Sequence, residues 1–340
     1  MPANLSPEFK DAQEAFRRAR EPKERLDCLR EMLRTIPKHK GTEHLQADLR
    51  TRIKELTEEV TSPRRPGAKG GPPVTVRPEG AGQVALLGPP NSGKSSLHAR
   101  LTGSHAVVGP YPFATKLPLP GMLPWEDVQF QLVDLPPVAE DYLEPWMPNA
   151  LQHADAALLV VDLAVPECLD LVEALRRRLA EKRVRLTASP DEAGEAATEE
   201  DALADAFGVR LPTALLAAQC DKLPDPAGEL EALRQLAGLA FPALAVSAET
   251  GHGLARVGPL LFEMLGVVRA YTKLPGHPPD RGRPFTLLRR ATVRDVASLV
   301  HRGRAAELRF ARLWGSGKFE GEQVSADHPL RDGDVVELHW

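Results

Sequence analysis

The chain has 340 residues and a formal net charge of −4, from 43 Lys and Arg against 47 Asp and Glu. An apolar fraction of 42% is ordinary for a globular protein, and the length is sufficient for two or three domains. The balanced charge gives no global case for nucleic-acid binding, although the middle of the chain is acidic and both ends are basic. Because no apolar run reaches the roughly 18 residues of a membrane span and no apolar leader opens the chain, a cytoplasmic protein is expected.

The N-terminal residues 1–60 are expected to form a helical hairpin. Apolar residues recur at helical spacing in two segments that are separated by a break at 37–41, with Thr42 as a candidate N-cap; they are Leu26, Leu29, Leu33 and Ile36, then Leu45, Leu49, Ile53, Leu56 and Val60. The other faces carry the basic residues Arg17, Arg18, Arg20, Arg50, Arg52 and Lys54. Those charges are either a solvated helix face or a surface for the phosphate backbone of RNA.

The middle of the chain predicts an α/β domain at residues 81–272. Residues 61–80 are rich in Pro and Gly and predict a linker. Short apolar strands then alternate with helical stretches, at 84–87, 128–133, 156–163, 213–218 and 241–246, and this alternation indicates a mostly parallel sheet covered by helices. A polar, acidic stretch at 189–205 is expected to be an insertion.

The C-terminal residues 280–340 predict a small α+β module after a Pro-rich turn at 273–279. Its expected strands, at 285–288, 309–314 and 335–338, surround one helix. The three cysteines of the chain, Cys28, Cys168 and Cys220, lie far apart and have no metal-ligand spacing, so we expect free thiols.

A phosphate-binding loop is the strongest motif. The segment from Gly88 to Ser95 fits Gly-x4-Gly-Lys-Ser, and it lies where its mechanism requires, between an apolar strand and a helix. Backbone amides of such a loop and of the helix start face a β-phosphate, the lysine neutralises phosphate charge, and the serine hydroxyl binds magnesium. The expected phosphate-binding residues are Gly88, Asn91, Ser92, Gly93, Lys94, Ser95 and Ser96.

Two downstream residues could complete a magnesium site. Thr115 lies in an irregular segment suited to closing over a γ-phosphate, which makes it a candidate ligand; the alternative is an ordinary Pro-rich surface loop. Asp134 ends an alternating strand at the edge where open α/β sheets bind ligands, and its alternative role is a strand-end cap. With Lys94, these are the candidate catalytic residues.

Two strand ends could recognise the base. Asp221 follows the strand at 213–218 and could accept hydrogen bonds from the ring N–H and the exocyclic amine of guanine. Ser247, Ala248 and Glu249 follow the strand at 241–246 and could position the edge of the base. Either feature alone is weak, because an aspartate after a strand is more often a helix cap. Their order after the phosphate-binding loop favours guanine.

Taken in this order, the motifs resemble those of the Obg-related translation-factor GTPases, most closely the developmentally regulated GTP-binding protein family. The resemblance covers nearly the whole chain and is carried by residues 38–45, 88–95, 111–115, 134–136, 247–251, 300–302, 313–316 and 327–336. It implies a P-loop GTPase domain that hydrolyses GTP with Mg²⁺, association with ribosomes, and a β-grasp TGS domain at the C-terminus. The inserted domain that the family carries after its magnesium loop is expected to be absent or reduced.

The chain departs from the family pattern at several positions. Pro137 stands where the third motif has glycine, and it has no N–H to donate to a γ-phosphate. Val138 stands where many GTPases have a glutamine that orients water. Ala218 and Gln219 replace the Asn-Lys of the base motif. Asn91 matches a variant of the loop seen in K⁺-stimulated GTPases, where this residue helps to hold the cation. The alternative is that Asn91 only makes a hydrogen bond within the loop.

Three functional hypotheses follow from these residues. The first is a slow GTPase that acts as a switch in translation, binding GTP and GDP. The second is a degenerate scaffold that binds nucleotide without hydrolysis and whose terminal domains bind RNA or protein. The third is a P-loop ATPase or kinase, since the phosphate cradle is indifferent to the base. Basic residues of the TGS-like module suggest that it binds structured RNA or the ribosome, and the alternative is a surface that docks a protein. These residues are Arg289, Arg290, Arg294, Arg302, Arg304, Arg309 and Arg312.

Overall fold

The structure is a computed structural model that describes residues 6–19, 22–37, 42–61, 76–104, 117–189, 208–287, 290–301 and 307–340. Contacts divide the chain into two compact units, Met1–Pro73 with Arg183–Arg185 and Asp191–Arg210, and Val74–Lys182 with Leu186–Pro190 and Leu211–Trp340. Thr115, most of the acidic stretch at 189–205 and most of the linker at 61–80 lie outside the described residues. Among the helices of the described part, none is long and apolar enough to cross a membrane.

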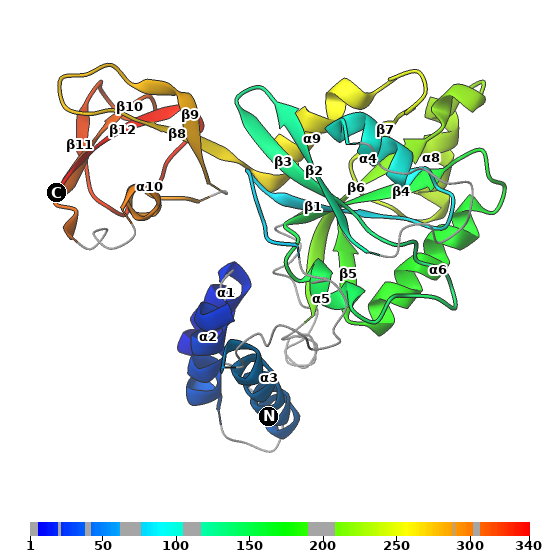
Figure 1. Cartoon of the computed structure of the whole chain (residues 1–340), viewed down its shortest axis with the longest axis horizontal. Helices are drawn as coiled ribbons and strands as arrows, with labels where there is room; N and C mark the ends of the chain where they lie inside the picture. Colours follow the sequence, from blue (N-terminus) through cyan, green and yellow to red (C-terminus); the bar gives the residue numbers. More distant parts are fainter. Residues whose placement is uncertain are drawn as a thin grey trace, which may run out of the picture. The chain divides into compact units, whose positions relative to one another are not determined.

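The helices and strands follow the alternation expected from the sequence (Figure 1). The helices are α1 Pro7–Arg18, α2 Pro22–Thr35, α3 Glu43–Thr61, α4 Lys94–Thr102, α5 Met147–Leu151, α6 Cys168–Glu181, α8 Pro226–Leu236, α9 Val257–Leu265 and α10 Val293–Val300, with 3₁₀ turns η3 Cys220–Lys222 and η4 Leu254–Arg256. The strands are β1 Gln83–Leu87, β2 Leu119–Trp125, β3 Val128–Asp134, β4 Ala156–Asp162, β5 Val184–Thr187, β6 Val209–Ala218, β7 Ala243–Ala245, β8 Val268–Thr272, β9 Asp280–Leu287, β10 Phe310–Trp314, β11 Glu322–Val324 and β12 Asp334–His339.

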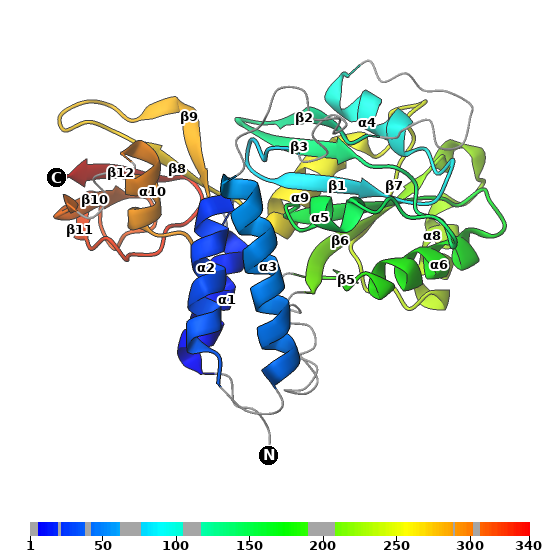
Figure 2. The same cartoon turned by 60° about the horizontal axis from the view of Figure 1, so that its bottom comes forward.

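The N-terminal helices pack around a core of their own. Figure 2 shows α1, α2 and α3 running side by side. The hairpin expected from the sequence corresponds to α2 and α3, and α1 is an additional helix that packs against α2. Ser6 caps α1 by accepting a hydrogen bond from the backbone N–H of Phe9 at 3.2 Å, and Pro7 occupies the first turn. The buried core consists of Phe9, Ala12, Leu29, Met32, Ile36, Leu45 and Leu49.

The first sheet has the strand order β2-β3-β1-β4-β6-β5, with β7 paired to β6. Pairing is parallel between β1 and β3, β1 and β4, β4 and β6, and β6 and β7, whereas β2 runs antiparallel to β3. Residues alternate between the two faces of a strand, and the face that carries Val84 and Leu86 packs against Leu97 of α4 and Leu261 of α9. The opposite face of β1 carries Ala85 and faces α5.

The strand β2 was not expected from the sequence, because it contains Pro120, Gly121 and Pro124. Proline cannot donate to a strand ladder, so a sequence with two prolines argues against a central strand. Within the described residues β2 pairs with β3 alone and forms the edge of the sheet, where a missing N–H can face solvent. Gly121 also has a packing role, since a Cβ at this position would lie 2.7 Å from the hydroxyl of Thr102.

The second sheet has five strands in the order β11-β10-β12-β8-β9, with α10 packed on one face. A capping box between Thr292 and Asp295 starts α10. The sheet begins with β8 at Val268, earlier than the expected start at residue 280, because β8 follows α9 directly after Gly266 without a linker-like stretch. The Pro-rich segment after residue 273 is the loop between β8 and β9 and not a boundary between the sheets.

Arg269 of β8 joins the two sheets of the second unit. Its guanidinium donates to Glu126 at 2.6 Å and to Asp127 at 2.9 Å, both in the turn between β2 and β3. It also donates to Asp332, just before β12 of the second sheet, at 2.7 Å. It also lies 5.0 Å from the ring centre of Phe262 in α9. The Arg269 side chain is only 18% exposed, and this single cation balances three carboxylates that themselves remain partly in contact with solvent.

The junction also shifts the titration of its acids. Burial raises the pKa of Asp127, but hydrogen bonds from Tyr271 and Arg269 outweigh it, so that the pKa lies below its usual value. The pKa of Asp332 is lowered in the same way by the side chain and backbone of Arg269, again against burial. A depressed carboxyl pKa stabilises the fold above about pH 4 and stops doing so as pH falls through the lower folded value.

Replacing Arg269 by Met should therefore destabilise the second unit by about 2 kcal/mol, because three carboxylates lose their common donor. The loss is measured by urea unfolding at neutral pH, and it should shrink as the pH is lowered below about 4. Arg281→Met is the matched control: Arg281 is exposed, lies on β9 of the same sheet and contacts the ring of Tyr271, and its loss should cost little. Equal effects of the two substitutions would contradict a special role for Arg269.

Candidate functional site

The expected functional residues gather at one edge of the first sheet. Parallel strands place their carboxyl ends at the same edge, and the register aligns Leu86 of β1 with Asp134 of β3 and Asp162 of β4 with Ala218 of β6. The phosphate-binding loop follows β1, and the candidate base loop follows β6. The structure therefore brings the phosphate, magnesium and base candidates to one side of the fold, as open α/β sheets do at their ligand sites.

The phosphate loop depends on glycine where its backbone passes close to β4. A Cβ on Gly88 would lie 2.3 Å from the carbonyl oxygen of Val160, so no other residue fits without moving the strand. Gly93 has φ 88° at the start of α4, and Asn91 has φ 58°, a conformation that asparagine tolerates better than most residues. Asn91 is exposed, and Ser92 is buried inside the loop.

Lys94 lies inside the loop, with 6% of its surface exposed. Its ammonium donates to the carbonyl oxygens of Gly88 at 3.1 Å and Pro89 at 2.9 Å. Burial lowers the pKa of Lys94 to about 8, while the charge of Asp134 acts in the opposite direction. Burial thus disfavours the charged form of Lys94, and a phosphate bound in the loop would favour it.

Ser95 and Asp134, the two residues expected to bind magnesium, are in direct contact. The Ser95 hydroxyl donates to Asp134 Oδ2 at 2.6 Å, and Asp134 is 1% exposed. Hydroxyl and carboxylate oxygens are hard donors of the kind that Mg²⁺ prefers, and the ion commonly keeps one or two protein ligands together with phosphate oxygens and water. Ser96 follows in the first turn of α4, half-buried. Thr115, the third candidate ligand, lies outside the described residues.

The base loop is held by a buried serine. Asp221 lies exposed in η3, and a hydrogen bond from the Ser247 hydroxyl lowers the pKa of its carboxyl group. Ser247 is fully buried, and its hydroxyl oxygen also accepts from the backbone N–H of Thr250 at 3.1 Å. Ala248 packs against the core, whereas Glu249 is exposed in the turn that follows. The two segments expected to recognise the base are thus in direct contact.

Comparison with known proteins agrees with this geometry. Residues 83–189 match the family model described as 50S ribosome-binding GTPase, and residues 268–339 match the TGS domain. A GTP-binding protein of Methanocaldococcus jannaschii is 26% identical over 93% of this chain and 92% of its own length. Developmentally-regulated G-protein 2 of Arabidopsis thaliana is 26% identical over 91% and 88%, and Ribosome-interacting GTPase 1 of Saccharomyces cerevisiae is 24% identical over 93% and 98%. The chain thus carries a GTPase domain and a TGS domain, and it is similar over most of its length to developmentally regulated GTP-binding proteins.

The departures from the family pattern have structural counterparts at the third motif. Pro136 and Pro137 supply no N–H, and the first amide after them, that of Val138, donates to the carbonyl oxygen of Gly88 at 3.1 Å. Val138 is 1% exposed, so this segment lies packed against the phosphate loop. No backbone amide from residues 136–138 is left to face a γ-phosphate in this arrangement.

Asp162, which the sequence analysis did not single out, lies at the same sheet edge and contacts the loop after β6. Gln219, at the lysine position of the family's base motif, donates from its side-chain amide to Asp162 Oδ2. Ala218, at the asparagine position, places its methyl group beside the phosphate loop, 3.7 Å from where a Cβ of Gly93 would lie. The available signal was that Asp162 ends an apolar strand at the same sheet edge as Asp134, which is where ligand-site acids are found.

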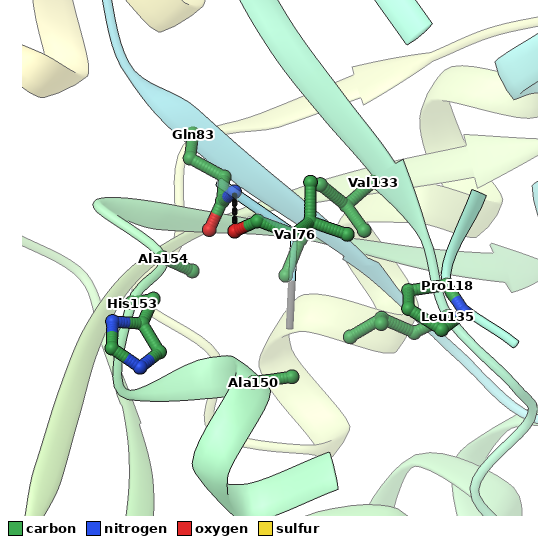
Figure 3. Close-up of a pocket in the computed structure, with 9 residues that line it drawn as sticks. Val76, Gln83, Pro118, Val133, Leu135, Ala150, His153 and Ala154 are labelled. Carbon is green, nitrogen blue, oxygen red and sulfur yellow. Dashed lines mark hydrogen bonds between the residues drawn. The ribbon is translucent and has the colours of Figure 1, made fainter. Parts of the chain in front are cut away.

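A separate hollow lies on the opposite face of the first sheet, next to α5. Figure 3 shows it between Val133 and Leu135 of the β3 region and Ala150 of α5, with His153 at one side; a hydrogen bond joins the Gln83 side chain to the backbone of Val76 at 3.2 Å. Its lining is almost entirely apolar, so it does not suit a phosphate or a magnesium ion. The chemistry-bearing residues lie at the sheet edge described above and not in this hollow.

The lowered pKa of Lys94 predicts a pH dependence of nucleotide affinity. Below pH 8 the ammonium is charged before binding, whereas above pH 8 the free protein must take up a proton to bind phosphate. The Kd for GDP should therefore rise about tenfold between pH 7 and pH 9. Calorimetry in two buffers of different ionisation enthalpy should show proton uptake in the same range.

The control for this titration is Ser95→Ala, which removes a magnesium ligand but keeps Lys94. Its GDP affinity should be lower at every pH, and its dependence on pH should remain that of the unmodified protein. An affinity that stays constant from pH 7 to pH 9, without proton uptake, would show that Lys94 is not the titrating group.

Proposed function

We propose that this protein is a magnesium-dependent guanine-nucleotide-binding protein that acts at the ribosome and turns over GTP slowly. The observation that carries the proposal is the set formed by Lys94, Ser95 and Asp134, in which a buried ammonium adjoins a hydroxyl–carboxylate pair. Magnesium bound by that pair would balance phosphate charge. Support for guanine comes from Asp221, held by Ser247 at the neighbouring strand end. Asn91 is the candidate residue for a K⁺ ion beside the phosphates.

Ribosome association is supported from two sides. One relative is named a ribosome-interacting GTPase, and the family model that matches the G domain is described as ribosome-binding. Basic side chains are also exposed on both terminal parts of the chain, among them Arg50 and Lys54 of α3 and Arg309, Arg312 and Arg331 of the TGS domain. Such surfaces fit the phosphate backbone of ribosomal RNA.

One observation favours a second function, that of a scaffold that binds nucleotide without using it as a switch. The amide of Val138 is committed to Gly88, and Pro137 has none. An equal affinity for GTP and GDP is expected when no group of the protein distinguishes the two. In this second function the nucleotide stabilises the G domain while the terminal domains bind the partner. The two functions differ in whether phosphate release exceeds that of a Lys94→Ala control.

Co-sedimentation tests the ribosomal partner. The full-length protein should pellet with ribosomes at low salt and be lost progressively as salt is raised, because contacts with the phosphate backbone release counterions. Arg309→Ala with Arg312→Ala in the TGS domain should lower the bound fraction, and the exposed acid Glu320→Ala is the matched surface control. Binding that is insensitive to both salt and the arginine substitutions would favour a protein-docking role for the TGS domain.

Restoring the amide tests the nucleotide switch. Pro137→Gly supplies an N–H at the position where the family has glycine, and a charge-assisted hydrogen bond to a γ-phosphate should favour GTP over GDP by about tenfold or more. The unmodified protein should bind the two within a factor of a few. Affinities are measured by calorimetry with GDP and a non-hydrolysable GTP analogue, and phosphate release is followed in the same proteins.

Pro136→Gly is the matched control for this substitution, because it relaxes the backbone equally but places the new amide one residue earlier. It should leave the GTP to GDP ratio unchanged. If the unmodified protein already prefers GTP by tenfold, or if both glycine variants gain the same preference, the interpretation of Pro137 is wrong.

A further inference from the structure

We infer that Asp162 is a positioning residue for guanine recognition: through the side chain of Gln219 it holds the loop 219–222 so that Asp221 can face the base. The inference rests on the proposed function, in which Asp221 recognises guanine by hydrogen bonds. It assigns a function to Gln219, which in the family pattern is a lysine, and to an acid on a neighbouring strand. Both residues lie at the sheet edge that carries the phosphate loop.

The Gln219 side chain is engaged at both ends. Its amide nitrogen donates to Asp162 Oδ2, and its amide oxygen accepts from the ammonium of Lys222. Only a side chain with a donor and an acceptor can make both bonds, whereas a lysine at this position could only donate. The resulting chain of Asp162, Gln219 and Lys222 spans the loop on either side of Asp221.

The backbone of Gln219 requires such support. Gln219 has φ 56° and ψ 31°, in the left-handed region that is unfavourable for a residue with a Cβ. Its side-chain bond to Asp162 offsets that cost and selects the turn that begins η3. The backbone N–H of Lys222 then donates to the carbonyl oxygen of Gln219 at 3.0 Å, which closes the turn around Asp221.

Asp162 is itself well oriented for this role. It ends β4, aligned with Ala218 of β6 in the parallel register. Its Oδ1 accepts from the backbone N–H of Ala164 at 2.9 Å, which leaves Oδ2 directed to Gln219. The carboxylate therefore connects the end of one strand to the base loop of the next.

This connection replaces one that the chain lacks. Ala218 offers only a methyl group toward the phosphate loop, so the base loop makes no side-chain hydrogen bond there from the position where the family has asparagine. Ser247 holds Asp221 from the strand on the other side. Without the bond from Gln219 to Asp162 the loop would be held from that side alone, and contacts to the base would suffer while contacts to phosphate would not.

The experiment compares a nucleotide with a probe that lacks the base. Asp162→Ala, Gln219→Leu and the double variant are titrated in Mg²⁺ with GDP and, by competition against labelled GDP, with inorganic pyrophosphate. Each single substitution should weaken GDP by about tenfold and leave pyrophosphate within a factor of two. Because both remove the same bond, the double variant should be no weaker than either single one.

The matched control is Asp225→Ala, which removes another aspartate near the loop, one that caps α8 through the backbone N–H of Gly228 at 3.1 Å. It should leave GDP affinity unchanged. The inference is overturned if Asp162→Ala leaves GDP affinity unchanged, if it weakens GDP and pyrophosphate equally, or if the two substitutions are additive. Asp221→Asn tests the underlying function separately, since it should shift preference from GDP to xanthosine diphosphate; failure of that shift refutes guanine reading by Asp221.

Discussion

The carbonyl oxygen of Gly88 is the point on which the arrangement of the site depends. It accepts from the ammonium of Lys94 and from the backbone N–H of Val138, so it joins the end of β1 to α4 and to the segment after β3. Strand β4, which pairs with β1 in parallel, also passes close to Gly88: a Cβ there would lie 2.3 Å from the carbonyl oxygen of Val160. A side chain at residue 88 would push the phosphate loop away from β4.

The hydrogen bond from Val138 to Gly88 also bears on whether the protein can distinguish GTP from GDP. A family member with glycine at residue 137 has an amide that can turn toward a γ-phosphate, whereas here two prolines precede an amide that already donates to the cradle. The hydrogen bond keeps a buried donor satisfied, and Val138 adds its apolar side chain to the core. Residues 136–138 are thus stabilised in one position. To contact a γ-phosphate, the amide of Val138 would have to give up its bond to Gly88.

The sequence placed the candidate residues that depend on local pattern and gave no sign of contacts that depend on strand pairing. Gly88 to Ser95 was predicted because strand, loop and helix are consecutive, and Asp134 because it ends an alternating strand. The contact of Asp162 with Gln219 requires knowing that β4 and β6 are neighbours, which no local pattern gives. The strand β2 was missed because its prolines are tolerated only at a sheet edge, and the start of the second sheet because β8 follows α9 without a linker.

Strand β3 relates the nucleotide site to the TGS domain. It ends at Asp134, the magnesium candidate, and begins beside Asp127, which Arg269 holds together with Asp332 of the second module. Strand β3 is paired on each side, and its carboxyl end carries the part-buried hydrogen bond between Ser95 and Asp134. The carboxylates around Arg269 connect the TGS domain to the turn between β2 and β3. Nucleotide that binds at the phosphate loop would therefore stabilise the folded G domain, because a ligand that binds only the folded state favours it.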